Sequence, residues 1–242
     1  MNTKPKVSII LPTYNVDQSL IDQTLKSVLK QKYQNWEIII VDAGDCGVSG
    51  DKKIKVIKAL PRGISDAFNK GIKAAKGDYL YFIGAGDYFW SDNSIEKVMK
   101  GIDVEKDMLI CGKINRITED GEKVLYTSSI DFKKWRLLYK MGLPHQALFT
   151  NKKFFDRYGL FDVNCKYAMD YELLLRSYKE FPKVIIKDVI VAAWRAGGIG
   201  TNKIDKILDE YHRIRLKNKI AMVFVLNLIY FISKLRYKIW HE

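Results

Sequence analysis

The chain has 242 residues, of which 48% are hydrophobic, so it is long enough for one α/β domain with a modest appendage and too apolar to be disordered. Its formal net charge of +13 indicates a basic surface that would attract nucleic acid, an acidic membrane leaflet or a phosphate-bearing substrate. The cysteines Cys46, Cys111 and Cys165 are widely spaced and form no CxxC pair. This spacing argues against a disulfide framework or a zinc site and favours reduced thiols in the cytosol. Residues 1–6 are polar and lead straight into a strand, so we expect no signal peptide.

Strands and helices alternate through the first part of the chain. Apolar runs predict strands at 7–11, 36–41, 54–57 and 79–83, and helical spacing predicts helices at 19–31 and 64–75. We expect Pro12 to turn the chain after the first strand, because proline is not tolerated in a central strand. The order strand, helix, strand, strand, helix, strand predicts a mostly parallel sheet covered by helices.

The second part of the chain has a less regular pattern. It predicts helices at 94–100, 132–139, 152–158 and 167–178, strands at 108–111, 143–149 and 184–191, and a flexible glycine-rich loop at 197–200. A hairpin over 113–126 is expected to turn at Asp120 and Gly121. These elements give one α/β domain over residues 1–202 and a basic, apolar helical tail over 203–242.

Polar or glycine-rich loops follow several of the predicted strands. In an open α/β sheet the carboxyl ends of the strands form the ligand-binding edge. Asp87 would place a carboxylate at this edge, although an aspartate after a strand is also an ordinary turn or cap residue. The residues at the edge are Pro12, Thr13, Tyr14 and Asn15 after the first strand, Asp42 at the end of the second, and Gly84, Ala85, Gly86 and Asp87 after the fourth.

The motifs, taken in this order, resemble those of family 2 glycosyltransferases, especially bacterial surface-polysaccharide enzymes. The matching segments are 7–15 (VSIILPTYN), 37–42 (EIIIVD), 62–71 (RGISDAFNKG), 77–87 (GDYLYFIGAGD) and 161–162 (FD) followed by 169–172 (MDYE). Each motif alone is weak, but the ordered set covers roughly residues 5–200 and is specific. The resemblance implies a GT-A fold, a nucleotide-sugar donor, a divalent cation and inversion at the anomeric carbon.

The resemblance assigns the donor nucleotide to the first three loops. Asp42 resembles the residue that accepts a hydrogen bond from a pyrimidine ring, which favours uracil- or thymine-type bases. Thr13 and Tyr14 would flank the base. Asp45 lies in the following loop, which in members of the family is usually richer in Ser and Thr. Arg62 would approach the base or a phosphate, and Asp66 the ribose or the sugar. Both residues could equally be the cap and first turn of the helix that starts near Ile64. The candidate donor-binding residues are Pro12, Thr13, Tyr14, Asn15, Asp42, Arg62, Asp66 and Gly86.

Asp87 occupies the position of the family's metal-binding motif. Mg²⁺ and Mn²⁺ prefer oxygen ligands and are held by one or two protein carboxylates together with phosphates and water. Gly84 and Gly86 stand where members of the family commonly have a second acidic residue. The resemblance therefore implies Mn²⁺ or Mg²⁺ with Asp87 as the direct protein ligand.

The late motif implies a general base for the acceptor hydroxyl. We expect this base to be Asp170, with Glu172 as the alternative, although Asp170 could instead cap the helix that follows it. His145 is either a hydrogen-bonded core histidine or an acceptor-side residue. Arg195, in the segment before the glycine-rich loop and next to Trp194, is a candidate charge partner for the diphosphate.

The tail contains an apolar run at 220–232 that is bracketed by basic residues. A bilayer-spanning helix needs about twenty apolar residues, so this run is too short. We expect an interfacial helix on an anionic membrane, with Tyr230, Tyr237 and Trp240 at the interface, and the alternative is a helix packed in the core or in a homodimer. The protein would then be cytoplasmic and peripheral on the cytoplasmic face of the bacterial inner membrane.

The leading hypothesis is an inverting glycosyltransferase that moves a sugar from a nucleotide-diphosphate donor, with a UDP-sugar expected, to a polyprenyl-diphosphate-linked glycan. A metal-dependent sugar-phosphate nucleotidyltransferase is one alternative, but residues 11–17 lack that class's glycine- and lysine-bearing loop. A non-enzymatic nucleic-acid binder is another, but the basic residues are scattered and match no nucleic-acid-binding module, so we expect no nucleic-acid partner.

Overall fold

The computed structural model describes residues 4–50, 52–198 and 200–241, without the side chains of Trp240 and His241. Two predicted features extend outside the described residues: the glycine-rich loop at Ile199 and the polar amino terminus at residues 1–3. Among the described residues, nine strands form one sheet in the order β3-β2-β1-β4-β8-β6-β9-β5, with β7 paired to β6. The strands are β1 (Val7–Thr13), β2 (Trp36–Asp42), β3 (Ile54–Lys58), β4 (Tyr79–Phe82), β5 (Tyr88–Phe89), β6 (Leu109–Ile117), β7 (Val124–Thr127), β8 (Leu148–Asn151) and β9 (Val184–Arg195). The helices are α1 (Gln18–Leu29), α2 (Ile64–Ala74), α3 (Ser94–Met99), α4 (Lys152–Tyr158), α5 (Met169–Arg176), α6 (Ile204–Asn218) and α7 (Val223–His241), with 3₁₀ turns η1 (Lys134–Leu138), η2 (His145–Ala147) and η3 (Tyr178–Glu180).

The predicted α/β architecture with flanking helices is confirmed, and the sheet is mixed. β3, β2, β1 and β4 are parallel neighbours, as the alternation of strands and helices predicts. Beyond β4 the sheet changes, because β8 runs antiparallel to both β4 and β6. The predicted hairpin is the antiparallel β6–β7 pair, and β9 is longer than predicted.

The prediction that Pro12 turns the chain is wrong, since β1 continues through Pro12 to Thr13 and pairs with β2 over its whole length. β1 is a central strand only as far as Ile10, its last residue in register with β4. The Ile10 carbonyl accepts from the Ile83 N–H on the β4 side, so the Pro12 nitrogen also faces that side, where β4 has already ended. Pro12 therefore removes no hydrogen bond from the sheet.

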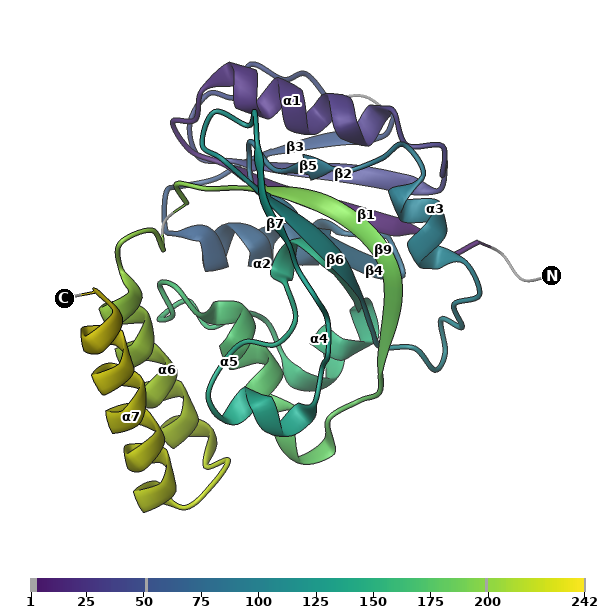
Figure 1. Ribbon diagram of the computed structural model, residues 1–242. Helices are drawn as coiled ribbons and strands as arrows, with labels where there is room; N and C mark the ends of the chain where they lie inside the picture. The colour runs from purple at the N-terminus through teal and green to yellow at the C-terminus, as the bar shows by residue number, and fades with distance from the viewer. Residues whose placement is uncertain (1–3, 51, 199, 242) are drawn as a thin grey trace.

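The helices cover the sheet from both sides. In Figure 1, α1 lies above the parallel strands, and α2, α4 and α5 lie on the opposite side. The sequence marks Gly71 as a weak point of α2, but a Cβ at this position would lie 2.3 Å from Ile10 Cγ2 on β1. Glycine thus allows α2 to pack directly against β1.

The carboxyl-terminal helices α6 and α7 lie side by side, and α6 packs against α5 (Figure 1). α6 is an integral part of the fold, because Arg215 is fully buried and its guanidinium donates 2.8 Å to the Leu138 carbonyl. Over the described residues, we find no helix with the length and apolar composition needed to span a bilayer. The division of the chain at residues 202 and 203 stays a prediction.

Candidate functional site

The parallel register brings three polar side chains to one corner of the sheet. Thr13 ends β1 in register with Asp42 at the end of β2, and Asp42 is in register with Lys58 at the end of β3. Residues in register on neighbouring strands point to the same face of the sheet. Two of these residues are predicted site residues, and Lys58 is an addition that the structure provides.

Asp42 is the most extensively hydrogen-bonded carboxylate of this corner. Its side chain is only 1% exposed. Its Oδ1 accepts from Thr13 Oγ1 at 2.8 Å and from the Gly44 N–H at 3.1 Å, and its Oδ2 accepts from Lys58 Nζ at 2.7 Å and from the Cys46 N–H at 3.3 Å. Burial raises the pKa of Asp42, but these donors outweigh it and lower the pKa to about 2. The group is therefore a fixed anion at neutral pH.

The loop after β1 lies against the loop after β2. A Cβ added to Gly44 would lie 3.2 Å from both the backbone nitrogen and Oδ1 of Asn15. Tyr14, just before it, is 54% exposed and therefore has a free ring face. Asp45 is on the outside, with its carboxylate 3.7 Å from Lys58 Nζ. Of the predicted base-binding residues, Thr13 contacts Asp42, and Tyr14 is exposed in the loop that lies against Gly44.

The turn after β4 depends on Gly86 and on a threonine of α1. Gly86 has a φ of 89°, a conformation that glycine adopts most readily. Its N–H donates to Thr24 Oγ1 at 3.0 Å, and Thr24 Oγ1 in turn donates to the Asp87 carbonyl at 2.7 Å. A Cβ at Gly86 would also lie 3.0 Å from Arg195 Nε. The turn therefore fixes the direction of the Asp87 side chain.

Asp87 is a buried carboxylate with few donors. It is 7% exposed, and its Oδ1 accepts from the Arg195 N–H at 2.9 Å. Burial raises the pKa of Asp87 to about 7, and the hydrogen bond from Arg195 N offsets only part of the rise. The Arg195 guanidinium lies beside the turn, where it donates to the Gly86 carbonyl at 3.3 Å and to Gln23 Oε1 at 2.7 Å. Arg195 is thus placed next to Asp87, on the proposed diphosphate side.

A divalent cation fits Asp87 only as a partly protein-bound ion. Within the described ranges of the chain, no group of three or more His, Cys, Asp or Glu side chains is arranged to hold a metal ion. Mg²⁺ and Mn²⁺ usually keep several waters and bind through one or two carboxylates together with substrate phosphates. A single buried carboxylate whose pKa is raised to about 7 would gain from a cation beside it. The residues present therefore fit an ion that arrives with the nucleotide.

The end of β4 also leads to the predicted acceptor side. The Phe82 ring on β4 stacks on His145 of η2, with 5.9 Å between the ring centroids. Burial lowers the pKa of His145, and the Asp170 carboxylate counteracts this effect, so the two side chains are electrostatic neighbours. Burial and the same carboxylate raise the pKa of Tyr211 on α6. Asp170 is half-buried at the start of α5, between η2 and α6.

The beginnings of α2 and α5 are tied together beside Asp170. Ser65 donates 2.8 Å to Met169 Sδ, and the Asn69 amide forms a two-way pair with the Phe161 backbone at 2.9 Å in each direction. Arg62 is exposed just before α2, and Asp66 is half-buried in its first turn. Asp66 also pairs with Lys70 on the same helix, as a first-turn residue would. Both residues therefore lie at the end of α2 that borders α5.

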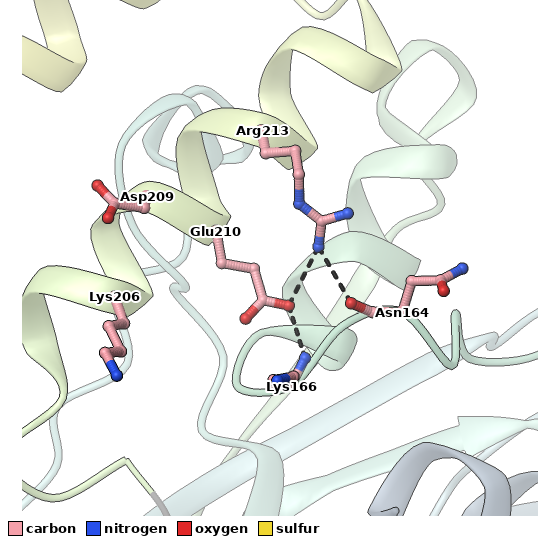
Figure 2. Close-up of a pocket in the computed structure, with 6 residues that line it drawn as sticks. All are labelled: Asn164, Lys166, Lys206, Asp209, Glu210 and Arg213. Atoms are coloured by element: carbon pink, nitrogen blue, oxygen red, sulfur yellow. Dashed lines mark hydrogen bonds and ion pairs between the residues drawn. The ribbon is translucent and has the colours of Figure 1, made fainter.

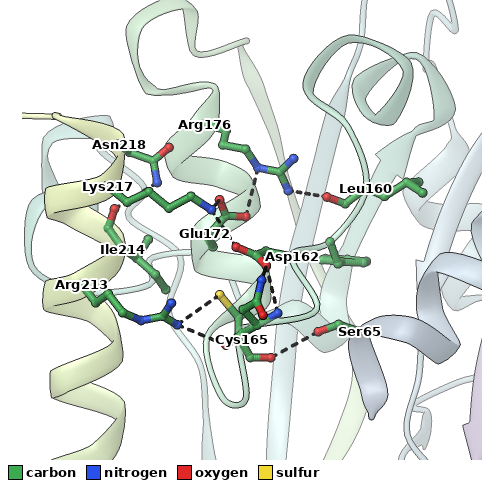
Figure 3. Close-up of polar contacts among 12 residues, drawn as sticks. Ser65, Leu160, Asp162, Cys165, Glu172, Arg176, Arg213, Ile214, Lys217 and Asn218 are labelled. Atoms are coloured by element: carbon green, nitrogen blue, oxygen red, sulfur yellow. Dashed lines mark hydrogen bonds and ion pairs between the residues drawn. The ribbon is translucent and has the colours of Figure 1, made fainter. Parts of the chain in front are cut away.

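Glu172 has a different environment from Asp170. It is fully buried, with its carboxylate oxygens 3.0 Å from Arg176 Nε and 3.5 Å from Lys217 Nζ. Figure 3 shows Lys217 of α6 reaching between Glu172 and Asp162, with a 2.7 Å ion pair to the latter. This cluster joins α5 to α6. The Glu172 carboxylate is already paired with Arg176 and Lys217. The half-buried Asp170 is therefore the better placed of the two candidate bases.

The hollow in Figure 2 is separate from the strand ends. It lies between α6 and the loop before α5 and is lined by Asn164, Lys166, Lys206, Asp209, Glu210 and Arg213. Glu210 accepts from the backbone N–H groups of Lys166 and Tyr167 at 2.7 and 3.0 Å, so its carboxylate is used to hold the loop. We therefore interpret the hollow as the place where α6 docks on that loop.

Three residues of the site were not predicted from the sequence. Lys58 could have been found only from the register of β3. Thr24 holds the turn that carries Asp87, and Asn69 holds the loop that precedes α5 and Asp170. Thr24 and Asn69 lie inside the predicted helical segments. A polar residue there that faces the sheet is the pattern that could have identified them.

Comparison with known proteins gives consistent results. Residues 8–161 match the family model described as glycosyl transferase family 2. WcaA of Escherichia coli (strain K12), a glycosyl transferase assigned to colanic acid biosynthesis, is 31% identical over 201 residues, which cover 75% of this chain and 69% of WcaA.

Solved structures share the fold. S. aureus TarS (residues 1–349), crystallised with UDP-GlcNAc, has a TM-score of 0.65 and 16% identity, covering 93% of this chain and 70% of that one. The mannosyltransferase PcManGT of Pyrobaculum calidifontis, in complex with GDP-Man and Mn²⁺, has a TM-score of 0.63 and 14% identity, covering 89% of this chain and 65% of that one.

Proposed function

Because the chain belongs to glycosyl transferase family 2, we propose that it transfers a sugar from a nucleoside-diphosphate donor to an acceptor hydroxyl, with inversion at the anomeric carbon. One structural relation carries the proposal. Phe82 of β4 stacks on His145, the electrostatic neighbour of Asp170, and Asp87 lies in the turn that follows β4. We infer from this relation that the two carboxylates, which are far apart in the sequence, face one substrate site.

We propose that the donor is a UDP-sugar. Asp42 is ionised at neutral pH, so it accepts hydrogen bonds and favours a base with a ring N–H, such as uracil. The exposed ring of Tyr14 would stack on this base. The complex of TarS with UDP-GlcNAc supports this choice, since TarS shares the fold.

The reaction would use Asp170 as the general base. Its carboxylate takes the proton from the acceptor hydroxyl while the oxygen attacks C1 of the sugar from the side opposite the diphosphate. The C1–O bond to the diphosphate breaks, and its electron pair leaves with the phosphate oxygen. Asp87 would hold Mn²⁺ or Mg²⁺, which when bound neutralises charge on the leaving group. Arg195, whose guanidinium lies beside Asp87, adds positive charge on that side.

We propose a lipid-linked glycan as the acceptor, within cell-surface polysaccharide biosynthesis. The likeness to WcaA supports the pathway class. The exposed face of α7 supports a membrane location, because its large apolar residues Phe224, Leu228, Phe231, Leu235 and Ile239 are 47–69% exposed. This pattern is typical of a helix that lies in a membrane interface. The protein would then act at the cytoplasmic face of the membrane, where nucleotide sugars are available.

The assignment is tested by incubating the protein with a panel of nucleotide sugars, Mn²⁺ and acceptor lipids, and measuring nucleoside-diphosphate release and glycosylated lipid. Asp170→Asn should reduce transfer about 10²- to 10⁴-fold with nearly unchanged donor affinity, because it removes only the base. Asp156→Asn on α4 is the control, since this exposed carboxylate lies outside the site. Full transfer by Asp170→Asn would reject the base, and release of pyrophosphate from NTP and sugar phosphate would favour a nucleotidyltransferase.

A further inference from the structure

We propose that Lys58 competes with the donor base for Asp42, so that its ammonium group must leave the carboxylate before a pyrimidine N–H can bind there. The inference rests on the proposed function, in which Asp42 receives that N–H. It concerns a residue at the end of β3 that belongs to no motif in the sequence.

The hydrogen-bonding capacity of Asp42 is already filled. A carboxylate accepts about four hydrogen bonds, two on each oxygen. Thr13 Oγ1 and the Gly44 N–H occupy Oδ1, and Lys58 Nζ and the Cys46 N–H occupy Oδ2. A fifth donor can therefore bind well only if one of these four moves away.

Lys58 is the donor that can be displaced at low cost. Thr13 is 4% exposed on β1, and the N–H groups of Gly44 and Cys46 are fixed by the loop backbone. The Lys58 side chain, in contrast, is 65% exposed and covers Asp42 from the solvent side. After leaving Asp42 it would still have partners nearby, because Nζ lies 3.2 Å from the Gly44 carbonyl and 3.7 Å from Asp45 Oδ1.

The exchange makes the Asp42 site selective for bases that donate a hydrogen bond. The ammonium yields its place only to a group that donates a hydrogen bond to Asp42, so a base without a donor at this position gains nothing by entering. An ion pair with one exposed partner is weak, so the competition lowers donor affinity only about two- to fivefold. Removing Lys58 should therefore tighten binding of a uracil nucleotide, although it also removes a positive charge near an anionic ligand.

The experiment compares the full-length wild type, Lys58→Met and Lys55→Met by calorimetric titration with UDP and with UDP methylated at N3, both in the presence of Mn²⁺. Lys55 is exposed on the same strand, so Lys55→Met controls for the loss of one positive charge. We expect Lys58→Met to bind UDP about two- to fivefold more tightly than Lys55→Met. The methylated nucleotide, which lacks the N–H, should show no such gain.

Equal or weaker UDP binding by Lys58→Met, or an equal gain for the methylated nucleotide, would overturn the inference. Lys58→Ala is the second variant if Lys58→Met does not fold, and the same expectation applies to it because alanine has no side-chain donor. Failure of the proposed function gives a different result: the wild type would then bind no nucleoside diphosphate, or Asp42→Asn would bind UDP as tightly as the wild type.

Discussion

At the scale of single residues, Asp42 and Asp87 are two buried carboxylates with opposite electrostatic properties. Asp42 has four donors, which lower its pKa to about 2 despite burial. For Asp87, the nearby hydrogen bonds and positive charges, foremost the Arg195 N–H on Oδ1, offset only part of the effect of burial, so its pKa is raised to about 7. A carboxylate of the second kind destabilises the fold whenever it is ionised. A cation bound beside Asp87 would offset this cost.

Asp87→Asn should therefore stabilise the free protein while abolishing metal-assisted donor binding. The folded pKa is raised from 3.8 to about 7, so the folded state holds its proton longer than the unfolded state. Wild-type stability consequently falls as pH rises from about 4 to 7 and then levels off. The stabilisation by asparagine, whose Oδ1 can keep the Arg195 N–H, should be absent at pH 4 and largest above pH 7, with an upper limit on the order of 4 kcal/mol.

Chemical denaturation of both proteins between pH 4 and 8, in parallel with Mn²⁺-dependent UDP titration, checks this prediction. Asp156→Asn on α4 is the matched control, because that carboxylate is exposed and its loss should leave both properties unchanged. An Asp87→Asn variant that is less stable than the wild type at pH 8, yet binds donor normally, would show that Asp87 is an ordinary turn residue.

At the scale of elements, the site depends on how α2 holds the loop before α5. The Asn69 side chain donates to the Phe161 carbonyl and accepts from its N–H, both at 2.9 Å in a buried position. Removing the amide leaves both backbone groups without a partner, at a cost of about 1–3 kcal/mol for each buried group. Because α5 begins soon after this loop, its displacement would also move Asp170.

We expect Asn69→Ala to lower the free energy of unfolding by about 2 kcal/mol or more and to reduce the rate of transfer. Donor affinity should change much less, because Asp42 and Asp87 are held by β1, β2 and α1. Urea denaturation and separate measurements of kcat and donor Kd test this difference. Lys73→Ala on the exposed side of α2 is the control, and an equal loss of donor affinity and kcat in Asn69→Ala would argue against a local effect on Asp170.

The sequence predicts those parts of the fold that depend on local patterns. Apolar runs gave the parallel strands, and the loops after them contained Asp42 and Asp87. The effect of Pro12 does not follow from the sequence, because it depends on whether β4 is still beside β1, which is a tertiary property. Lys58 was missed for the same reason, since its place beside Asp42 follows from the register of β3. The preference for Asp170 over Glu172 comes from the sequence motif, and the ion pair between Glu172 and Lys217 of α6 adds a structural reason for it.

At the scale of the whole molecule, α7 turns one side toward α6 and its apolar face outward. α7 is tied to α6 on its inner side, where Lys234 forms 2.5 and 2.6 Å ion pairs with Asp205 and Asp209. The buried Leu226 faces the same way, and the exposed apolar residues lie on the opposite side of the helix. Arg236 and Lys238 are exposed near its end. An apolar face with basic neighbours matches an anionic bilayer surface.

The full-length protein should therefore bind vesicles of phosphatidylcholine with phosphatidylglycerol more strongly than vesicles of phosphatidylcholine alone, and added salt should weaken binding by screening. Leu228→Ser with Phe231→Ser should abolish co-flotation, because it removes apolar contacts from the outer face. Val124→Ser with Leu125→Ser on β7 is the matched control, with similarly exposed apolar residues far from α7. The alternative is that the apolar face of α7 forms a homodimer, and sedimentation without lipid tests it. If the wild type is a dimer that dissociates in the α7 double variant, and neither protein binds vesicles, this face belongs to an interface with a second copy of the chain and the membrane proposal is refuted.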